Sequence, residues 1–124
     1  MTHSLSQIPP KPPGRDVRGF LPDHEGQQLY EWANHAASVG PLLEIGSYCG
    51  RSTIWLGQAA QAHNAVVFAL DHHRGSEEHQ PGESHHDEAL VGTAGQFDSF
   101  SEFRRNIVAA GLENTIIPVV ASSE

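Results

Sequence analysis

Three short apolar runs, separated by two stretches of helical periodicity, constrain the fold of this chain more than any other feature. The runs cover residues 42–45, 65–70 and 115–120, and helical patterns begin near Ser52 and near Asp98 or Ser99. Strands that alternate with helices pair in parallel through right-handed crossovers. We therefore expect an α/β fold, in which these elements form a β-α-β-α-β half of a doubly wound sheet with strand order 3-2-1.

A further helix should precede the first strand. Asp23 is its expected N-cap, and Gly40-Pro41 should end it. Its apolar stripe, which we expect to be buried, comprises Leu29, Trp32, Ala33, Ala36 and Ala37. Residues 1–19 are polar and rich in proline, which predicts a disordered or loosely docked tail. Residues 20–124 then form one domain.

Individual residues in and next to the apolar runs predict further details of the strands and helices. The second run is apolar at consecutive positions, as in a parallel strand that is buried on both faces. Pro118 cannot donate to a sheet ladder, so the third strand should lie at an edge. Ser52 should cap the helix after the first strand, and Trp55 should lie in the core. At the next helix, Ser99 and Glu102 have the spacing of a capping box.

The balance of charges excludes one class of partner. The chain has 7 basic and 15 acidic residues, a formal net charge of −8 with neutral histidines. Nucleic-acid binding requires a basic face, so no nucleic-acid partner is expected. No run approaches the roughly 18 apolar residues of a membrane-spanning helix, so no membrane partner is expected either. The single cysteine, Cys49, cannot form an internal disulfide, which favours a cytoplasmic location.

The turn after the first strand combines a carboxylate with two glycines. It reads Glu44-Ile45-Gly46-Ser47-Tyr48-Cys49-Gly50-Arg51-Ser52-Thr53. Tyr48 replaces the middle glycine of a G-x-G-x-x-G dinucleotide motif, and a phosphate-binding P-loop needs a longer spacer and a lysine in place of Arg51. The turn closely resembles the E-x-G-x-x-x-G loop of class I S-adenosylmethionine-dependent methyltransferases. It is most similar to members that methylate small molecules at oxygen.

This resemblance implies a Rossmann-like fold and S-adenosylmethionine as the methyl donor. Glu44 would attract the ammonium group of the donor, and the two glycines would leave room for its methionine part. Ser52 or Thr53 would bind its carboxylate. Asp71, at the end of the second strand, would accept hydrogen bonds from both ribose hydroxyls. The implied donor-binding residues are Glu44, Gly46, Ser47, Gly50, Ser52, Thr53, Asp71, His72 and, beside the adenine, Ser122.

Residues 71–88 are rich in histidine and in acidic side chains. Their spacing matches no closed zinc pattern, so no metal ligand is assigned. We interpret the segment as a solvated loop, with a lid over the donor and a metal site as alternatives. His72 and His73 are candidates for a general base, but the sequence alone identifies no catalytic residue.

The resemblance covers residues 20–124, which correspond to only the first half of such a methyltransferase domain. We expect a fragment of a longer protein or a partner chain, such as a second copy, because the first strand would otherwise have an unpaired edge. The expected function is the donor-binding half of a methyltransferase that acts on a small molecule at oxygen, with no activity of its own. Two alternatives remain open: a non-catalytic module that binds a nucleoside or the donor, and a histidine-rich metal-binding oligomer.

Overall fold

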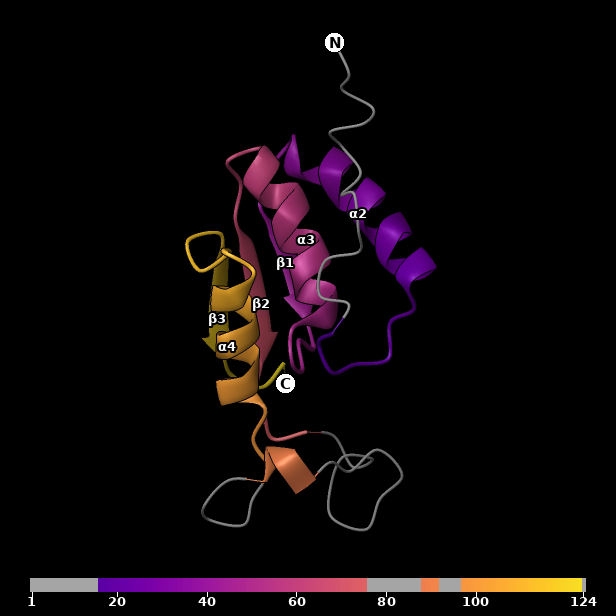
Figure 1. Ribbon diagram of the computed structural model, residues 1–124. Helices are drawn as coiled ribbons and strands as arrows, with labels where there is room; N and C mark the ends of the chain where they lie inside the picture. The colour runs from indigo at the N-terminus through magenta and orange to yellow at the C-terminus, as the bar shows by residue number, and fades with distance from the viewer. Residues whose placement is uncertain (1–15, 76–87, 92–96, 124) are drawn as a thin grey trace.

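The computed structural model describes residues 16–75, 88–91 and 97–123. In chain order its elements are α2 (Asp23–Ala37), β1 (Leu42–Ile45), α3 (Arg51–Ala62), β2 (Val67–Asp71), the 3-10 turn η2 (Glu88–Leu90), α4 (Phe100–Ala109) and β3 (Ile116–Val120). Helices α3 and α4 lie on one face of the sheet, and α2 packs beside α3 (Figure 1). The expected β-α-β-α-β unit with a preceding helix is confirmed.

The three strands are parallel and lie in the order β1-β2-β3, which is 3-2-1 when counted from the β3 edge. The register places Glu44 beside Ala69, and Ala69 beside Pro118. In the described part of the chain β3 pairs only with β2, so the edge position expected from Pro118 is confirmed. Because the strands are parallel, their carboxyl ends meet at one edge of the sheet, where Gly46 and Asp71 lie.

The helix-covered face of the sheet carries the core, with Trp55 of α3 inside it as expected. The Trp55 side chain is 2% exposed and meets Tyr30 edge to face, with ring centroids 6.5 Å apart. A Cβ atom on Gly26 would lie 2.2 Å from the indole, so only glycine fits at that position. This contact fixes the rotation of α2, whose buried residues are Gly26, Tyr30, Ala33 and Ala37.

The expected burial of Trp32 is wrong. Its side chain is 67% exposed, and Ala36 is exposed as well. Since Gly26 must face Trp55, the buried stripe of α2 follows Gly26 at helical spacing, and this turns Trp32 toward solvent.

The opposite face of the sheet is apolar and, over the described residues, uncovered. Two cross-strand rows lie on it, one formed by Leu43, Phe68 and Ile117 and one by Ile45, Leu70 and Val119. Leu43 and Ile45 are 65% and 63% exposed, and Phe68 is 37% exposed. The expectation that the second strand is buried on both faces is therefore not met, because α3 and α4 cover only one face (Figure 1).

The side-chain caps expected at the N-termini of the helices do not form. The N-cap of α2 is Pro22 and that of α3 is Gly50, and neither helix has a side-chain cap hydrogen bond. Asp23 and Ser52 lie within the first turns instead. Ser99 is the N-cap of α4, but the capping box does not form. The Asp98 carboxylate accepts the N–H of Phe100 at 2.9 Å in its place.

None of the described helices has the length and apolar character needed to cross a membrane. Residues 1–15 and 76–87 lie outside the described residues. The expectations for the proline-rich tail and for most of the histidine-rich segment therefore stay predictions.

Candidate functional site

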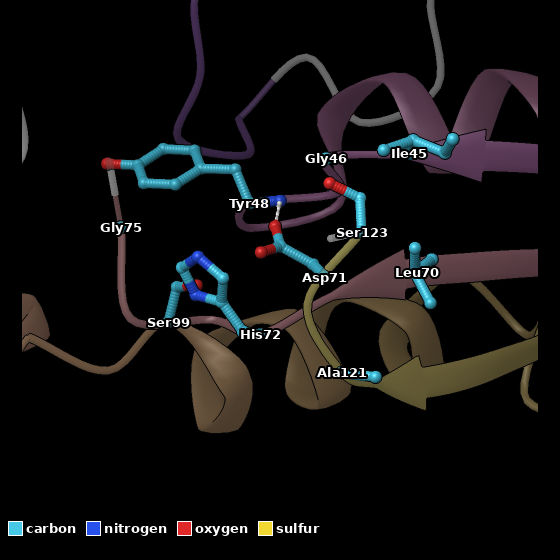
Figure 2. Close-up of a pocket in the computed structure, with 10 residues that line it drawn as sticks. All are labelled: Ile45, Gly46, Tyr48, Leu70, Asp71, His72, Gly75, Ser99, Ala121 and Ser123. Carbon is cyan, nitrogen blue, oxygen red and sulfur yellow. Dashed lines mark hydrogen bonds between the residues drawn. The ribbon is translucent and has the colours of Figure 1, made fainter. Parts of the chain in front are cut away.

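Two cavities open at the carboxyl edge of the sheet, and they share Gly46 and Tyr48. The first has a volume of about 280 Å³ and lies among the ends of the three strands (Figure 2). Of the expected residues, Gly46, Asp71 and His72 line it. The rest of its wall was not expected and comprises Ile45, Tyr48, Leu70, Gly75, Ser99, Ala121 and Ser123. In a parallel α/β sheet this is the edge at which ligands bind.

The second cavity, of about 320 Å³, lies at the start of α3. Three expected residues, Gly46, Ser47 and Ser52, line it together with Tyr48, Arg51 and residues 19–21. The Arg51 guanidinium holds the segment before α2 against this wall. It donates to the backbone carbonyl of Leu21 at 2.7 Å and to that of Val17 at 3.0 Å. The chain before α2 therefore helps to shape the site.

The Asp71 carboxylate organises the turn that separates the two cavities. Its Oδ2 accepts the backbone N–H of Ser47 at 2.9 Å and that of Tyr48 at 2.8 Å. Its Oδ1 accepts the N–H of His73 at 2.9 Å. Figure 2 shows this side chain projecting from the end of β2 toward Tyr48. A carboxylate oxygen accepts about two hydrogen bonds, so the described residues fill Oδ2 and leave one position of Oδ1 for a ligand.

These contacts keep Asp71 ionised. Burial acts to raise the pKa of Asp71, but the hydrogen bonds from the amides of His73 and Tyr48 outweigh it, and the pKa lies below its usual value. Tyr48 and His73 also have left-handed backbones, with φ of +50° and +63°, which non-glycine residues seldom adopt. Asp71 thus binds the amides of two residues in uncommon conformations.

Glu44 faces the helix-covered side of the sheet and lines neither cavity. Its carboxylate accepts hydrogen bonds from the hydroxyls of Ser52 and Thr53. Burial raises the pKa of Glu44, and the hydroxyls of Ser52, Thr53 and Ser47 offset this in part. The Ser47 hydroxyl is buried, and within the described part of the chain it has no hydrogen-bond partner of normal geometry. Among the described residues no cationic side chain offsets the charge of Glu44.

The two glycines of the turn serve different purposes. Gly46 has a φ of +88°, and a Cβ atom there would meet no atom within 4 Å. Gly50 has a φ of +96°, but its Cβ would lie 3.3 Å from Phe103 and 3.4 Å from Ile107. Gly46 therefore leaves space at the junction of the cavities, whereas Gly50 leaves space for α4.

The structure brings part of the expected set together. The expected residues that line a cavity are Gly46, Ser47, Ser52, Asp71 and His72; those that line neither are Glu44, Gly50, Thr53 and Ser122. Ser123 lines the first cavity where Ser122 was expected, and nothing in the sequence distinguishes these two serines. Tyr48 has a signal in the sequence, its place between the two glycines. The described residues contain no cluster of three potential metal ligands.

A family model described as a methyltransferase domain matches residues 43–124. The match spans more than half of the chain and includes the turn after β1, Asp71 and β3. The chain belongs to the methyltransferase domain family. The resemblance to class I S-adenosylmethionine-dependent methyltransferases, drawn from Glu44 to Thr53, is thereby confirmed.

This methyltransferase domain is similar in fold to cofactor-bound Rv0187 from MTB, a protein of known crystal structure. The TM-score is 0.55 and the sequence identity is 22%. The match covers 94% of this chain and 38% of the Rv0187 chain. At this identity the likeness shows the fold alone, and the methyltransferase domain described here spans 38% of the length of Rv0187.

Proposed function

We propose that this chain is the donor-binding half of an S-adenosylmethionine-dependent methyltransferase that acts on a small-molecule acceptor at oxygen. The observation that carries the proposal is the junction of two cavities at Gly46, one containing Asp71 and the other the start of α3. A donor with a nucleoside part and an amino-acid part needs two adjoining subsites. Small-molecule sites have volumes of roughly 300–1,000 Å³, and each cavity lies near the lower end of that range.

The first cavity suits the adenosine part of the donor. Asp71 is ionised, and its Oδ1 keeps one acceptor position, which suits a ribose hydroxyl. A contact with both ribose hydroxyls would require a second acceptor position, on Oδ2, which already accepts the amides of Ser47 and Tyr48. His72 and Ser123 supply further polar groups in the same wall. We assign the turn that contains Ser122 and Ser123 to the adenine.

The second cavity suits the methionine part. Ser52 lies in the first turn of α3, where free backbone N–H groups and the helix dipole favour a carboxylate. Glu44 lies behind Ser52 and binds its hydroxyl. No cationic side chain of the described residues offsets its charge, and the ammonium group of the donor would supply a cation. Thr53 contributes indirectly, through its hydrogen bond to Glu44.

Bound S-adenosylmethionine would supply a methyl group that is already activated by its attachment to a sulfonium. The residues of this chain would bind and orient the donor, so their contribution to the rate is positioning. A general base is needed only where the acceptor must lose a proton. His72 is exposed and lines the first cavity, whereas the ring of His73 is buried and bonded to Ser99. His72 is therefore the better candidate for the base.

We also propose that the rest of the methyltransferase domain, as a continuation of this polypeptide, covers the open face of the sheet. The cross-strand rows that contain Leu43 and Ile45 would then become core. The acceptor pocket belongs to that missing part, so the 124-residue chain alone should not transfer methyl groups. A reducing cytoplasm fits the single cysteine of the sequence, Cys49, which is buried.

Isothermal titration calorimetry with the purified chain tests the proposal. S-adenosylmethionine and S-adenosylhomocysteine should each bind at one site with a micromolar dissociation constant, and ATP should not bind, because neither cavity has a phosphate-binding loop. The absence of binding by both ligands at millimolar concentration would reject the proposal. Binding without methyl transfer by the complete protein would favour the non-catalytic alternative.

A further inference from the structure

His73 is a buried titratable side chain to which the proposed donor site gives no direct role. It follows Asp71 by two residues, and its side chain is 2% exposed. Its ring Nδ1 shares a hydrogen bond of 2.8 Å with the Ser99 hydroxyl, and its backbone carbonyl accepts the N–H of Ser99 at 2.9 Å. Two hydrogen bonds therefore tie the end of β2 to the residue that begins α4.

The ring also packs against α4. Its centroid lies 5.2 Å from that of Phe100 and 5.1 Å from that of Phe103. These contacts and the bond to Ser99 hold His73 in its left-handed conformation, which costs energy for a residue with a side chain. In that conformation its backbone N–H reaches Oδ1 of Asp71. The backbone conformation that directs this N–H at Asp71 is therefore the one in which the ring contacts Ser99 and α4.

The surroundings of the ring favour its neutral form. Burial lowers the pKa of His73, while Asp71 and Asp98 raise it and do not fully compensate. The other groups around the ring are His72, which lowers the pKa, the backbone of Tyr48, which raises it, and the uncharged Phe100 and Phe103. Nε2 is buried and has no hydrogen-bond partner in the part of the chain that the structure describes, so a second ring proton would lack a well-placed acceptor there.

We propose that His73 is a positioning residue of the donor site, which holds the Asp71 carboxylate in the orientation that binds the amides of Ser47 and Tyr48. The inference rests on the proposed function for its ligand. The contacts run from α4 through the ring of His73 to Oδ1 of Asp71, and from Oδ2 to the turn between the cavities. His73 itself touches no ligand. Loss of its hydrogen-bonding side chain, or a charge on the ring, releases the turn that both parts of the donor contact.

Two substitutions separate this role from a general contribution to folding. His73→Ala removes the ring, whereas His73→Asn keeps a hydrogen-bonding side chain that tolerates a left-handed backbone but does not titrate. His35→Ala, at an exposed site on α2, is the matched control. At about pH 8, His73→Ala should bind S-adenosylhomocysteine about tenfold more weakly, which corresponds to about 1.4 kcal/mol. His73→Asn should retain most of the affinity, and His35→Ala all of it.

The pH profile gives a readout that a merely structural role would not change. Because the pKa of His73 lies below its usual value of 6.5, wild-type affinity for S-adenosylhomocysteine should fall as the pH drops below 6.5 and the imidazole takes up a proton. The His73→Asn profile should lack this fall. Identical profiles for the two proteins would contradict the proposal, since every other titratable group is common to both.

Amide hydrogen exchange without ligand distinguishes failure of this inference from failure of the proposed function. The Ser47 and Tyr48 amides should exchange about tenfold faster in His73→Ala than in the wild type, relative to the sheet amides of Val67 and Ala69. If the wild type binds no S-adenosylhomocysteine, the proposed function fails, and the exchange rates still decide the role of His73. Equal exchange at Ser47 and Tyr48 in both proteins, or unchanged affinity in His73→Ala, overturns the inference.

Discussion

Tyr48 donates its backbone N–H to the Asp71 carboxylate at 2.8 Å, and this bond joins the end of β2 to the turn after β1. Both residues line the first cavity, and Tyr48 also lines the second. Asp71 therefore holds the turn after β1 in place, and the methyltransferase resemblance also assigns it to bind the ribose of the donor. The two tasks draw on the same oxygens, because three amides already occupy three of the roughly four acceptor positions of a carboxylate.

Asp71→Asn should lower both stability and donor affinity. An asparagine retains one acceptor oxygen, so its NH₂ group must face either the amides of Ser47 and Tyr48 or the amide of His73. Hydrogen bonds to charged groups contribute roughly 1.5–3 kcal/mol each, and we expect the free energy of unfolding to fall by about 2–3 kcal/mol. Urea unfolding followed by circular dichroism measures the change.

The matched control for this prediction is Asp98→Asn. The Asp98 carboxylate is exposed and accepts a single described amide, that of Phe100, so its loss should cost about 1 kcal/mol or less. Similar losses of stability in the two variants would argue against a special role for Asp71.

Glu44→Gln separates the effect of the buried Glu44 charge on stability from its effect on donor binding. Because burial raises the pKa of Glu44, the wild type loses stability as the pH rises from 4.5, the usual value, through the raised pKa of the folded protein. Glutamine carries no charge, so the variant should gain stability relative to the wild type as the pH rises. Its affinity for S-adenosylmethionine should fall roughly fivefold, or about 1 kcal/mol, because the ammonium group loses a counter-charge.

Urea unfolding at several pH values and calorimetry test these two effects of Glu44→Gln. Binding of 5′-methylthioadenosine, which lacks the amino-acid part of the donor, should stay unchanged in the variant. A stability difference that is constant across the pH range would refute the assigned charge effect, and equal weakening for both ligands would place Glu44 elsewhere in the site.

Gly46→Ala should weaken donor binding beyond its effect on stability. Gly46 has a φ of +88°, so alanine there pays about 1–2 kcal/mol for a left-handed backbone. Gly111 has a φ of +71° and equally open surroundings, so Gly111→Ala should lower the free energy of unfolding by a similar amount. Only Gly46 lies at the junction of the cavities, and only Gly46→Ala should reduce S-adenosylhomocysteine affinity, by about tenfold. Equal affinity in the two variants, measured by calorimetry, would remove Gly46 from the site.

The order of strands and helices could be predicted because its signals are local. Apolar runs, glycines at strand ends and helical periodicity each depend on a few adjacent residues. The rotation of α2 could not be predicted in this way, because it depends on the fit of the Trp55 indole over Gly26, which joins two elements far apart in the sequence. The side-chain cap expected of Ser52 failed for a similar reason, because α3 begins at Arg51 with Gly50 as its N-cap and the Ser52 hydroxyl binds the Glu44 carboxylate of β1 instead.

The same distinction between local signals and distant contacts applies to the residues of the site. Gly46 and Asp71 could be placed from the ends of their strands, because parallel strands bring their carboxyl ends to one edge. Other features of the site depend on contacts between segments that are distant in the sequence. Examples are the hydrogen bond from Arg51 to the backbone of Leu21, the position of Ser123 in the first cavity and the hydrogen bond between His73 and Ser99. No spacing in the sequence encodes such contacts.

Gly26→Ala tests the packing that sets the rotation of α2. A methyl group at Gly26 would overlap the Trp55 indole, and overpacking of a core costs about 1–3 kcal/mol. Gly40→Ala is the control, since a Cβ atom there would meet no atom within 4 Å. Urea unfolding should show a clear loss for Gly26→Ala and almost none for Gly40→Ala. A Gly26→Ala protein as stable as the wild type would mean that α2 can rotate, and Trp32 could then be buried.

The cross-strand row of Leu43, Phe68 and Ile117 leads to a prediction for the purified 124-residue chain. Monomeric proteins rarely expose a contiguous apolar patch of this kind, and the outer edge of β1 is unpaired among the described residues. The chain should therefore self-associate at concentrations of about 10–100 μM, which lie within the micromolar-to-millimolar range in which exposed apolar surface drives aggregation. Leu43→Lys should shift it toward monomer, because a charge on an edge strand opposes pairing.

Sedimentation velocity measures this shift, with Val39→Lys as the control. Val39 is 86% exposed and lies in the connection between α2 and β1, outside both cross-strand rows, so a lysine there adds the same charge without replacing a residue of the apolar face. If Val39→Lys dissociates the chain as well as Leu43→Lys does, net charge rather than the open face governs association. A monomeric wild type at these concentrations would show that the uncovered face of the sheet is tolerated in water, and would weaken the proposal that the rest of a methyltransferase domain covers it.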